Sequence, residues 1–444
     1  MFSLLKEKRL VGDAFWVLFG QLASAIALLA GTRLLTELVT PDIYGQVALL
    51  NGFVALGVAV FSYPFICAGM RMWPECQGDA ERAGLYKAVS NYTTRSTILA
   101  IGLLALGGAA YSYATASDIW LFIIAGILLA VTVQRELGIQ LLIGGRKQRS
   151  ASLWQTTDSI LRPVLAISLL WWGGQKAEWV LLGYILASMA SNLVWSFALR
   201  TKSKNTKIAK LTHNFRNEIW AYAVPLIPME LIFWVNGIGD RYVIGYLMSA
   251  ADVGLYVATY TIINEAFNRS AMVLLRTFQP VYFQSCAQNH GKDGFKILWI
   301  WIASVIALGI VGVTLLFLTK DWVASLVLAK SYHSAVELIP AVAVGCALHA
   351  LGTVVSQPLL ANKRTRLMLV GRVCGVVTAA ISIPLLVKSY GLLGAAIANP
   401  IYFGVEALVL AMLAKPWRTC LDGMGKNDVT GCEMTIQADG LTVT

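Results

Sequence analysis

Charged side chains are scarce in this sequence. Asp, Glu, Lys and Arg together make up only 13% of its 444 residues, about half the share that a soluble domain carries. Apolar residues make up 57%, and the mean hydropathy is +0.66. This composition excludes an ordinary soluble protein and indicates a chain that crosses a membrane many times.

Recognisable catalytic and metal-binding motifs are also missing. The sequence has no Walker loop, no GxGxxG after a strand, no HExxH and no nucleophile elbow. Its seven cysteines include no CxxC pair, which argues against a disulfide framework or a zinc site. We therefore expect no cofactor and no bound metal. An ATP-driven pump and an enzyme with a portable active site are both disfavoured.

Twelve long apolar segments are what the sequence does contain. A helix needs about 20 apolar residues to cross the hydrocarbon core, so these segments predict an all-α, polytopic membrane protein. Proline removes a backbone hydrogen bond, and we expect Pro225, Pro228 and Pro400 to kink or hinge two of the helices. The expected spans are residues 13–39, 44–70, 86–112, 118–144, 151–172, 178–199, 218–247, 252–280, 295–319, 334–361, 366–387 and 391–414.

Basic residues mark one side of the connections between the spans. Of the 35 Lys and Arg residues, 23 fall in or beside connections on the side of the N-terminus. The positive-inside rule then places both termini in the cytoplasm. The net charge of +11 follows from this asymmetry, so nucleic acid is not an expected partner. The basic residues in the opposite connections are Lys176, Lys320, Lys330 and Lys388.

A polar, basic stretch divides the chain into two sets of six spans. Because six is an even number, both sets start on the same side of the membrane, as parallel repeats do. The expected parts are an N-terminal six-helix lobe (1–200), a basic cytoplasmic linker (201–216), a C-terminal six-helix lobe (217–415) and a polar cytoplasmic tail (416–444).

A short internal similarity supports the repeat. The segment TRLLTELVTPDIYGQVAL resembles the segment DRYVIGYLMSAADVGLYVAT in the second half. Each has an Arg near the end of one helix, then a short turn, then a Gly that opens the next helix. Arg33 and Gly45 of the first segment correspond to Arg241 and Gly254 of the second, which predicts that the two halves are related.

Ionisable side chains inside the spans are the candidate functional residues, because a charge at membrane depth is costly unless it faces a polar cavity or another charge. Such pairs either fix helix packing or line a substrate cavity, and the sequence leaves both readings open. Three pairs lie one turn apart on expected helices: Arg33 with Glu37, Asp158 with Arg162, and Glu265 with Arg269.

Other intramembrane charges have no partner one turn away on their own helix. These are Arg95, Glu230, Arg372 and Glu406, which must pair across helices, with water or with a ligand. Asp240 and Arg241 complete the candidates for a cavity. His349 and Glu406 are the candidates for coupling to an ion or proton, although a lone membrane histidine also commonly hydrogen-bonds to a neighbour.

The segment GDRYVIGYLMSAADVGLYVATYTI, residues 239–262, resembles the Wzx-like polysaccharide biosynthesis (O-antigen) flippases of the multidrug/oligosaccharidyl-lipid/polysaccharide exporter superfamily. The segment TRLLTELVTPDIYGQVALL is similar to the N-terminal pattern of the same family, and the length and the 6+6 division also fit. The resemblance implies translocation of a polyprenyl-pyrophosphate-linked oligosaccharide across the bacterial inner membrane by alternating access. The implied partners are the lipid-linked oligosaccharide, membrane lipids, and a polysaccharide polymerase with its chain-length machinery.

Two other functions fit the same sequence less well. A cation-coupled multidrug antiporter of the same superfamily would use the membrane acids, but the many membrane arginines and the Asp240–Arg241 motif count against it. A membrane glycan polymerase or ligase normally needs a large outward loop, and the longest outward segment here is about Lys320–His333.

The charge asymmetry predicts which thiols are accessible from each side of the membrane. A membrane-impermeant thiol reagent added to intact cells should not label Cys76, Cys420 or Cys432, whereas the same reagent should label them in inverted vesicles. Labelling of these cysteines from outside intact cells would overturn the orientation.

Overall fold

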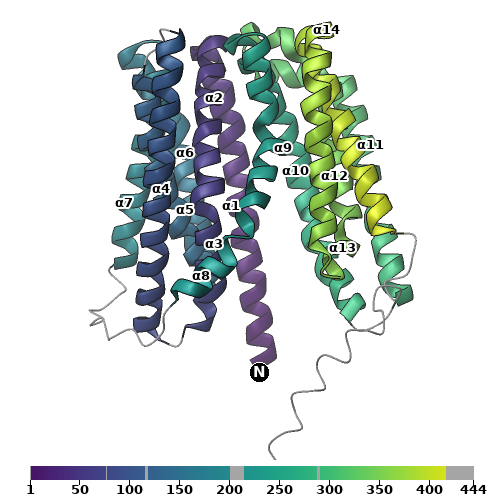
Figure 1. Cartoon of the computed structure of the whole chain (residues 1–444). Helices are drawn as coiled ribbons and strands as arrows, with labels where there is room; N and C mark the ends of the chain where they lie inside the picture. Colours follow the sequence, from purple (N-terminus) through teal and green to yellow (C-terminus); the bar gives the residue numbers. More distant parts are fainter. Residues whose placement is uncertain (1, 77, 116–118, 201–214, 288–290, 417–444) are drawn as a thin grey trace, which may run out of the picture. The chain divides into compact units, whose positions relative to one another are not determined.

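The computed structural model describes residues 2–76, 78–115, 119–200, 215–287 and 291–416, and every regular element in these ranges is a helix (Figure 1). The all-α, polytopic fold expected from the sequence is therefore confirmed. The first-half elements are α1 (Phe2–Leu38), α2 (Pro41–Leu56), the π-helix η1 (Gly57–Ser62), α3 (Tyr63–Met72), the 3₁₀ turn η2 (Trp73–Glu75), α4 (Asp79–Thr115), α5 (Trp120–Gly144), α6 (Gln148–Gly173) and α7 (Ala177–Arg200).

The second half has the same all-helical character. Its elements are α8 (Arg216–Ala223), α9 (Leu226–Leu247), α10 (Ala250–Ala287), α11 (Gly291–Val327), the 3₁₀ helix η3 (Lys330–Leu338), α12 (Ile339–Val355), α13 (Gln357–Ala361) and α14 (Thr365–Ala414). Residues 201–214 of the expected linker and 417–444 of the expected tail lie outside the described residues.

Nine helical segments of the described chain are long and apolar enough to cross a membrane. Two more expected spans correspond to α6 and α10, which have 26 and 38 residues but carry more polar side chains. One of the nine, α14, contains the final two expected spans. Each of the twelve spans expected from the sequence thus coincides with a helical segment of the described chain.

A glycine turns α14 into two antiparallel legs. Gly391 has φ +58° and ψ −139°, a conformation that residues with a Cβ rarely adopt. After this turn the second leg runs back along the first: a Cβ at Gly375 would lie 2.8 Å from a carboxylate oxygen of Glu406. The sequence predicts one span that ends at residue 387 and a next span that starts at Gly391 itself.

Prolines lie at boundaries between helical elements in two of the other spans. Pro225 lies between α8 and α9 and precedes the first residue of α9, as expected for a residue that cannot donate an intrahelical hydrogen bond. Pro64 follows the π-helix η1 as the second residue of α3. Pro400 lies inside the second leg of α14, where no break is seen. The π-helix was not expected from the sequence.

The described chain forms two compact units. Unit 1 comprises Met1–Glu265, Thr319–Ile339 and Ile383–Ile397, and unit 2 comprises Ala266–Leu318, Pro340–Ser382 and Ala398–Thr444. The division into a lobe of residues 1–200 and a lobe of residues 217–415 stays a prediction.

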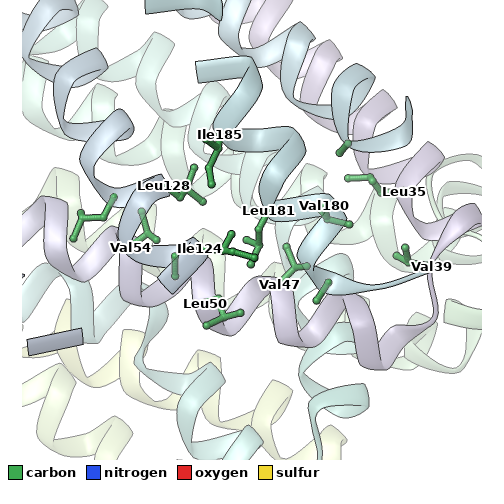
Figure 2. Close-up of a cluster of buried hydrophobic side chains, with 14 of the residues drawn as sticks. Leu35, Val39, Val47, Leu50, Val54, Ile124, Leu128, Val180, Leu181 and Ile185 are labelled. Carbon is green, nitrogen blue, oxygen red and sulfur yellow. The ribbon is translucent and has the colours of Figure 1, made fainter. Parts of the chain in front are cut away.

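The core of unit 1 lies among α1, α2, α5 and α7. Figure 2 shows Leu, Ile and Val side chains of these helices meeting in one buried cluster. Small residues allow close approach at the neighbouring contact between α1 and α6: a Cβ at Gly20 would lie 2.8 Å from Ser152 Cβ, and one at Gly31 would lie 2.8 Å from Pro163 Cβ. Small interfacial residues are the usual means of packing helices inside a bilayer.

In unit 2, buried aromatic side chains from α10 and α11 form much of the core. Trp301 and Tyr282 are fully buried, and the Phe278 ring stacks on Trp301 with 5.9 Å between the ring centroids. These side chains hold the second part of α10 against α11 and so position the charged residues that α10 carries.

The cysteines expected at the cytoplasmic ends differ in exposure. Cys76 is only 6% exposed, and its thiol donates to the Met72 carbonyl. Burial raises the pKa of the Cys76 thiol, so the reactive thiolate is rarer still. The expectation that Cys76 labels readily from the cytoplasmic side is therefore weakened. Cys286 is half-buried and more accessible, whereas Cys420 and Cys432 lie outside the described residues.

Candidate functional site

The most extensive charge cluster joins α5, α6 and α7 around Asp158, which is 2% exposed. Its carboxylate pairs with Arg162 Nε at 2.9 Å and with the guanidinium of Arg135. The hydroxyls of Ser188 and Ser191 donate to Asp158 Oδ1 at 2.9 and 3.3 Å. The expected pairing of Asp158 with Arg162 on one face is thus present, within a larger network.

The cluster is electrically balanced. Arg135 also pairs with Glu136 at 2.6 Å, so two guanidiniums face two carboxylates. Arg162 Nη2 donates to the Ser188 hydroxyl at 3.1 Å. This geometry favours the packing reading for Asp158 and Arg162, because their charges are compensated without a ligand.

Arg33 and Glu37 form the expected pair at the end of α1, with 2.7 Å between Nη2 and Oε1. Arg33 Nη1 also donates to the carbonyl of Leu328, and the Ala329 N–H donates to the Thr36 hydroxyl at 3.3 Å. The end of α1 is therefore fastened to the chain between α11 and η3, a contact that the sequence does not reveal.

Asp240 and Arg241 of the quoted motif lie near the end of α9. Asp240 is 6% exposed, and its carboxylate accepts hydrogen bonds from the Tyr256 hydroxyl at 2.6 Å and from the Arg241 N–H at 2.8 Å. The Arg241 side chain is half-buried, and among the described residues its buried Nε has no hydrogen-bond partner and its guanidinium no carboxylate partner. Arg241 thus has the bonding capacity to hold an anion.

Glu230 is the carboxylate that its surroundings compensate least. It is half-buried on α9, and no described residue forms a hydrogen bond or an ion pair with it. Tyr63 and Cys67 of α3 lie within electrostatic reach of this carboxylate. An uncompensated charge at membrane depth is costly, which makes Glu230 a candidate for contact with a ligand.

The polar stripe expected on the helix at 252–280 is carried by α10. This helix is continuous from Ala250 to Ala287, so Glu265 and Arg269 lie one turn apart. Both side chains are half-buried, whereas Arg276, two turns further along, is exposed.

In unit 2, Arg372 and Glu406 pair with each other across the two legs of α14. They are 7% and 1% exposed, so these two charges, which have no partner one turn away on their own helix, pair with each other. His349 of α12 lies within electrostatic reach of Arg372, and its ring centroid lies 4.5 Å from that of Phe403. Among the described residues the buried His349 Nδ1 has no hydrogen-bond partner.

Sequence reasoning missed Arg135 as a member of the cluster around Asp158. Arg135 and Glu136 are visible as charges inside the expected span 118–144, but nothing in the sequence indicates which helix they face. In the described part of the chain, no group of three or more His, Cys, Asp or Glu side chains is placed to hold a metal ion.

A family model described as "Polysaccharide biosynthesis protein" matches residues 10–285, which is more than half of the chain. The chain belongs to this family. No curated protein sequence matches it.

Solved structures similar to this family member are transporters. The structure "Lipid II flippase MurJ, inward closed conformation" has a TM-score of 0.68 at 13% identity, covering 91% of this chain and 87% of that one. An inward-facing multidrug resistance MATE family transporter of the MOP superfamily has a TM-score of 0.64 at 15% identity, covering 92% and 93%. A MATE structure in the straight conformation has a TM-score of 0.55 at 16% identity, covering 91% and 92%. The family member therefore has the MurJ- and MATE-like fold.

Removal of the central carboxylate should destabilise this family member. Asp158→Asn leaves two guanidiniums facing one carboxylate in a buried site, which should lower the free energy of unfolding by about 3 kcal/mol. Thermal unfolding of the purified protein in detergent would measure the loss. Glu37→Gln is the control, because that carboxylate is 47% exposed and its pair should contribute less than about 1 kcal/mol. Equal stability of the two variants would contradict the packing reading.

Proposed function

We propose that this protein translocates a polyprenyl-pyrophosphate-linked oligosaccharide across the bacterial cytoplasmic membrane for the synthesis of a surface polysaccharide. The observation that carries the proposal is a combination: the chain belongs to a polysaccharide biosynthesis family, and its fold is one shared with a lipid II flippase. A transport function explains why the chain consists of membrane helices and carries no recognised catalytic motif.

In this proposal, intramembrane arginines hold the pyrophosphate. A guanidinium binds a phosphate oxygen pair bidentately and stays charged in a low-dielectric site. Arg241 has unused bonding capacity, and Arg269 lies half-buried on α10, so these two are the strongest candidates. Arg33 has a secondary role because Glu37 and the Leu328 carbonyl already engage it.

Intramembrane carboxylates would accept hydrogen bonds from sugar hydroxyls. Glu230 is the best placed to do so because no described residue compensates it. Asp240 orients Tyr256, and Glu265 lies one turn from Arg269. Asp158, Arg162 and Arg372 are proposed to have a structural rather than a direct role, since each is held in a compensated pair.

We place ion coupling at His349 and Glu406. Protonation of Glu406 would remove the charge that holds Arg372, and the buried His349 Nδ1 is available to take part in the exchange. Uptake of a proton or cation by His349 and Glu406 would change the packing of the two legs of α14 against each other. In this proposal, that change in packing couples ion uptake to transport.

The charge asymmetry of the connections supports an orientation with both termini in the cytoplasm. The end of unit 1 where α1 meets α2 would then face away from the cytoplasm, and we call it the α1–α2 end. The product released there would be taken by a polysaccharide polymerase with its chain-length machinery.

A cation-coupled drug antiporter is the second candidate. The likeness to MATE structures and the uncompensated Glu230 carboxylate both favour it, since acids bind cationic drugs or coupling ions. The unpaired guanidinium of Arg241 favours an anionic substrate instead. A glycan polymerase or ligase has no comparable support, because the solved structures that resemble this chain are transporters.

Deletion of the gene separates the first two functions. Loss of the protein should abolish one surface glycan and leave lipid-linked repeat units on the cytoplasmic leaflet, because the substrate can no longer cross. Immunoblotting of surface polysaccharide and mass spectrometry of extracted lipids would measure both effects. Unchanged polysaccharide together with raised sensitivity to cationic dyes would favour the antiporter.

A charge swap on α10 tests whether Arg269 contacts the pyrophosphate. Glu265→Arg with Arg269→Glu keeps one acid and one base a turn apart on α10, but moves the cation about 6 Å along the helix and places a carboxylate at the anion site. Export should collapse while the folded protein remains in the membrane. Arg269→Lys should also be impaired, because the ammonium loses the bidentate fork.

The control for this swap is the reversal of Arg71 and Glu75, another pair one turn apart whose side chains are both exposed. Its reversal should cost only a few tenths of a kcal/mol and leave export intact. Normal glycan export by a well-expressed Glu265/Arg269 swap would assign the α10 stripe to packing alone.

A further inference from the structure

The first turns of α2 and α10 touch backbone to backbone inside unit 1. A Cβ at Gly45 would overlap the Ala250 carbonyl and lie 2.9 Å from the Gly254 nitrogen. A Cβ at Gly254 would overlap the Pro41 carbonyl and lie 3.0 Å from the Gly45 nitrogen. The two halves of the contact mirror each other, and neither position has room for a methyl group.

The same two glycines are the corresponding residues of the internal repeat, each opening the helix after an Arg and a short turn. The two copies of the repeat therefore contact each other at corresponding residues. Gly45 and Gly254 both lie on their helices one turn after the residue whose carbonyl the other glycine approaches. Such mutual packing of small residues is the arrangement that lets membrane helices come closest.

Near this contact, the side-chain hydrogen bonds that join α9 to α2 are neutral. Tyr242 donates its hydroxyl to the Leu49 carbonyl at 2.8 Å, and Trp234 donates its indole N–H to the Gly52 carbonyl at 2.9 Å. A neutral side-chain bond to a helix carbonyl breaks at a modest cost, because the carbonyl keeps its intrahelical partner. By contrast, separating the ion pairs around Asp158 would leave uncompensated buried charges.

These observations describe a seam, between α2 on one side and α9 and α10 on the other, whose side-chain hydrogen bonds can separate without breaking an ion pair. We propose that Gly45 and Gly254 form the closing contact of a gate at the α1–α2 end, and that side-chain size at these two positions sets the balance between its closed and open states. A methyl group at either glycine would disfavour the closed state, where the backbones touch, and would leave the open state unaffected. The inference rests on the proposed alternating-access transport, but its test requires no substrate.

The test measures access to a buried position beside the seam. Ala258 is one turn beyond Gly254 on α10 and is fully buried, so Ala258→Cys reports opening. A membrane-impermeant maleimide is applied to intact cells and, separately, to inverted vesicles. Gly45→Ala or Gly254→Ala is combined with Ala258→Cys. Each combination should raise the labelling rate of the introduced thiol about tenfold, because one methyl group is forced into a packed contact.

Gly237→Ala is the matched control, because a Cβ there meets no atom within 4 Å. The double variant Gly45→Ala/Gly254→Ala should label less than the product of the two single effects predicts, since both methyl groups open one contact. The membrane side from which labelling rises identifies the side that the gate faces. Gly45 and Gly254 test the same contact from different helices. If one glycine variant fails to accumulate in the membrane, the variant at the other glycine still tests the gate.

Labelling of both glycine variants at the rate of the Gly237→Ala control would overturn the gate. The other informative result combines two experiments. If the glycine variants label faster, and a strain that lacks the gene still makes normal surface glycan, the gate is upheld and the proposed substrate is rejected. The two proposals therefore fail separately.

Discussion

The constraint on which this structure depends is the cost of a charge inside the hydrocarbon layer. Asp158 and Arg372, both less than a tenth exposed, lie in ion pairs. Water is not available to solvate these groups, so a helix that carries one must pack against a helix that carries its partner. Charge compensation thereby determines which helices are held permanently together.

The contacts of α2 with α9 and α10 within unit 1 have a different chemistry. They rely on the glycine pair, on Tyr242 and on Trp234, with neutral bonds to carbonyls. Elsewhere in unit 1 the charged Arg33 joins the end of α1 to the Leu328 carbonyl. A transporter that opens alternately must have seams that separate repeatedly, and separating a neutral seam costs far less than separating buried ion pairs. Bond type therefore distinguishes the contacts that hold a helix group together from those suited to opening.

The candidate residues divide along the same line. Asp158 and Arg162 are compensated by the helices around them, whereas no described residue forms an ion pair at contact distance with Glu230 or with the Arg241 guanidinium. A side chain that is fully satisfied by the protein gains little from a ligand, while an unsatisfied one gains a partner. The proposed substrate contacts follow from this difference rather than from position in the sequence.

The sequence by itself determined the twelve helical segments, the break at Pro225 and the pairing of Arg33 with Glu37, because hydropathy, proline and one-turn spacing act locally along the chain. Only the tertiary structure decided that Arg135 meets Asp158, that Arg372 meets Glu406, and that Gly45 meets Gly254. Partner choice between helices depends on how whole surfaces of side chains fit together, and that fit involves residues far apart in the chain. Local pattern therefore predicts where a charge lies along its helix, whereas packing decides what it faces.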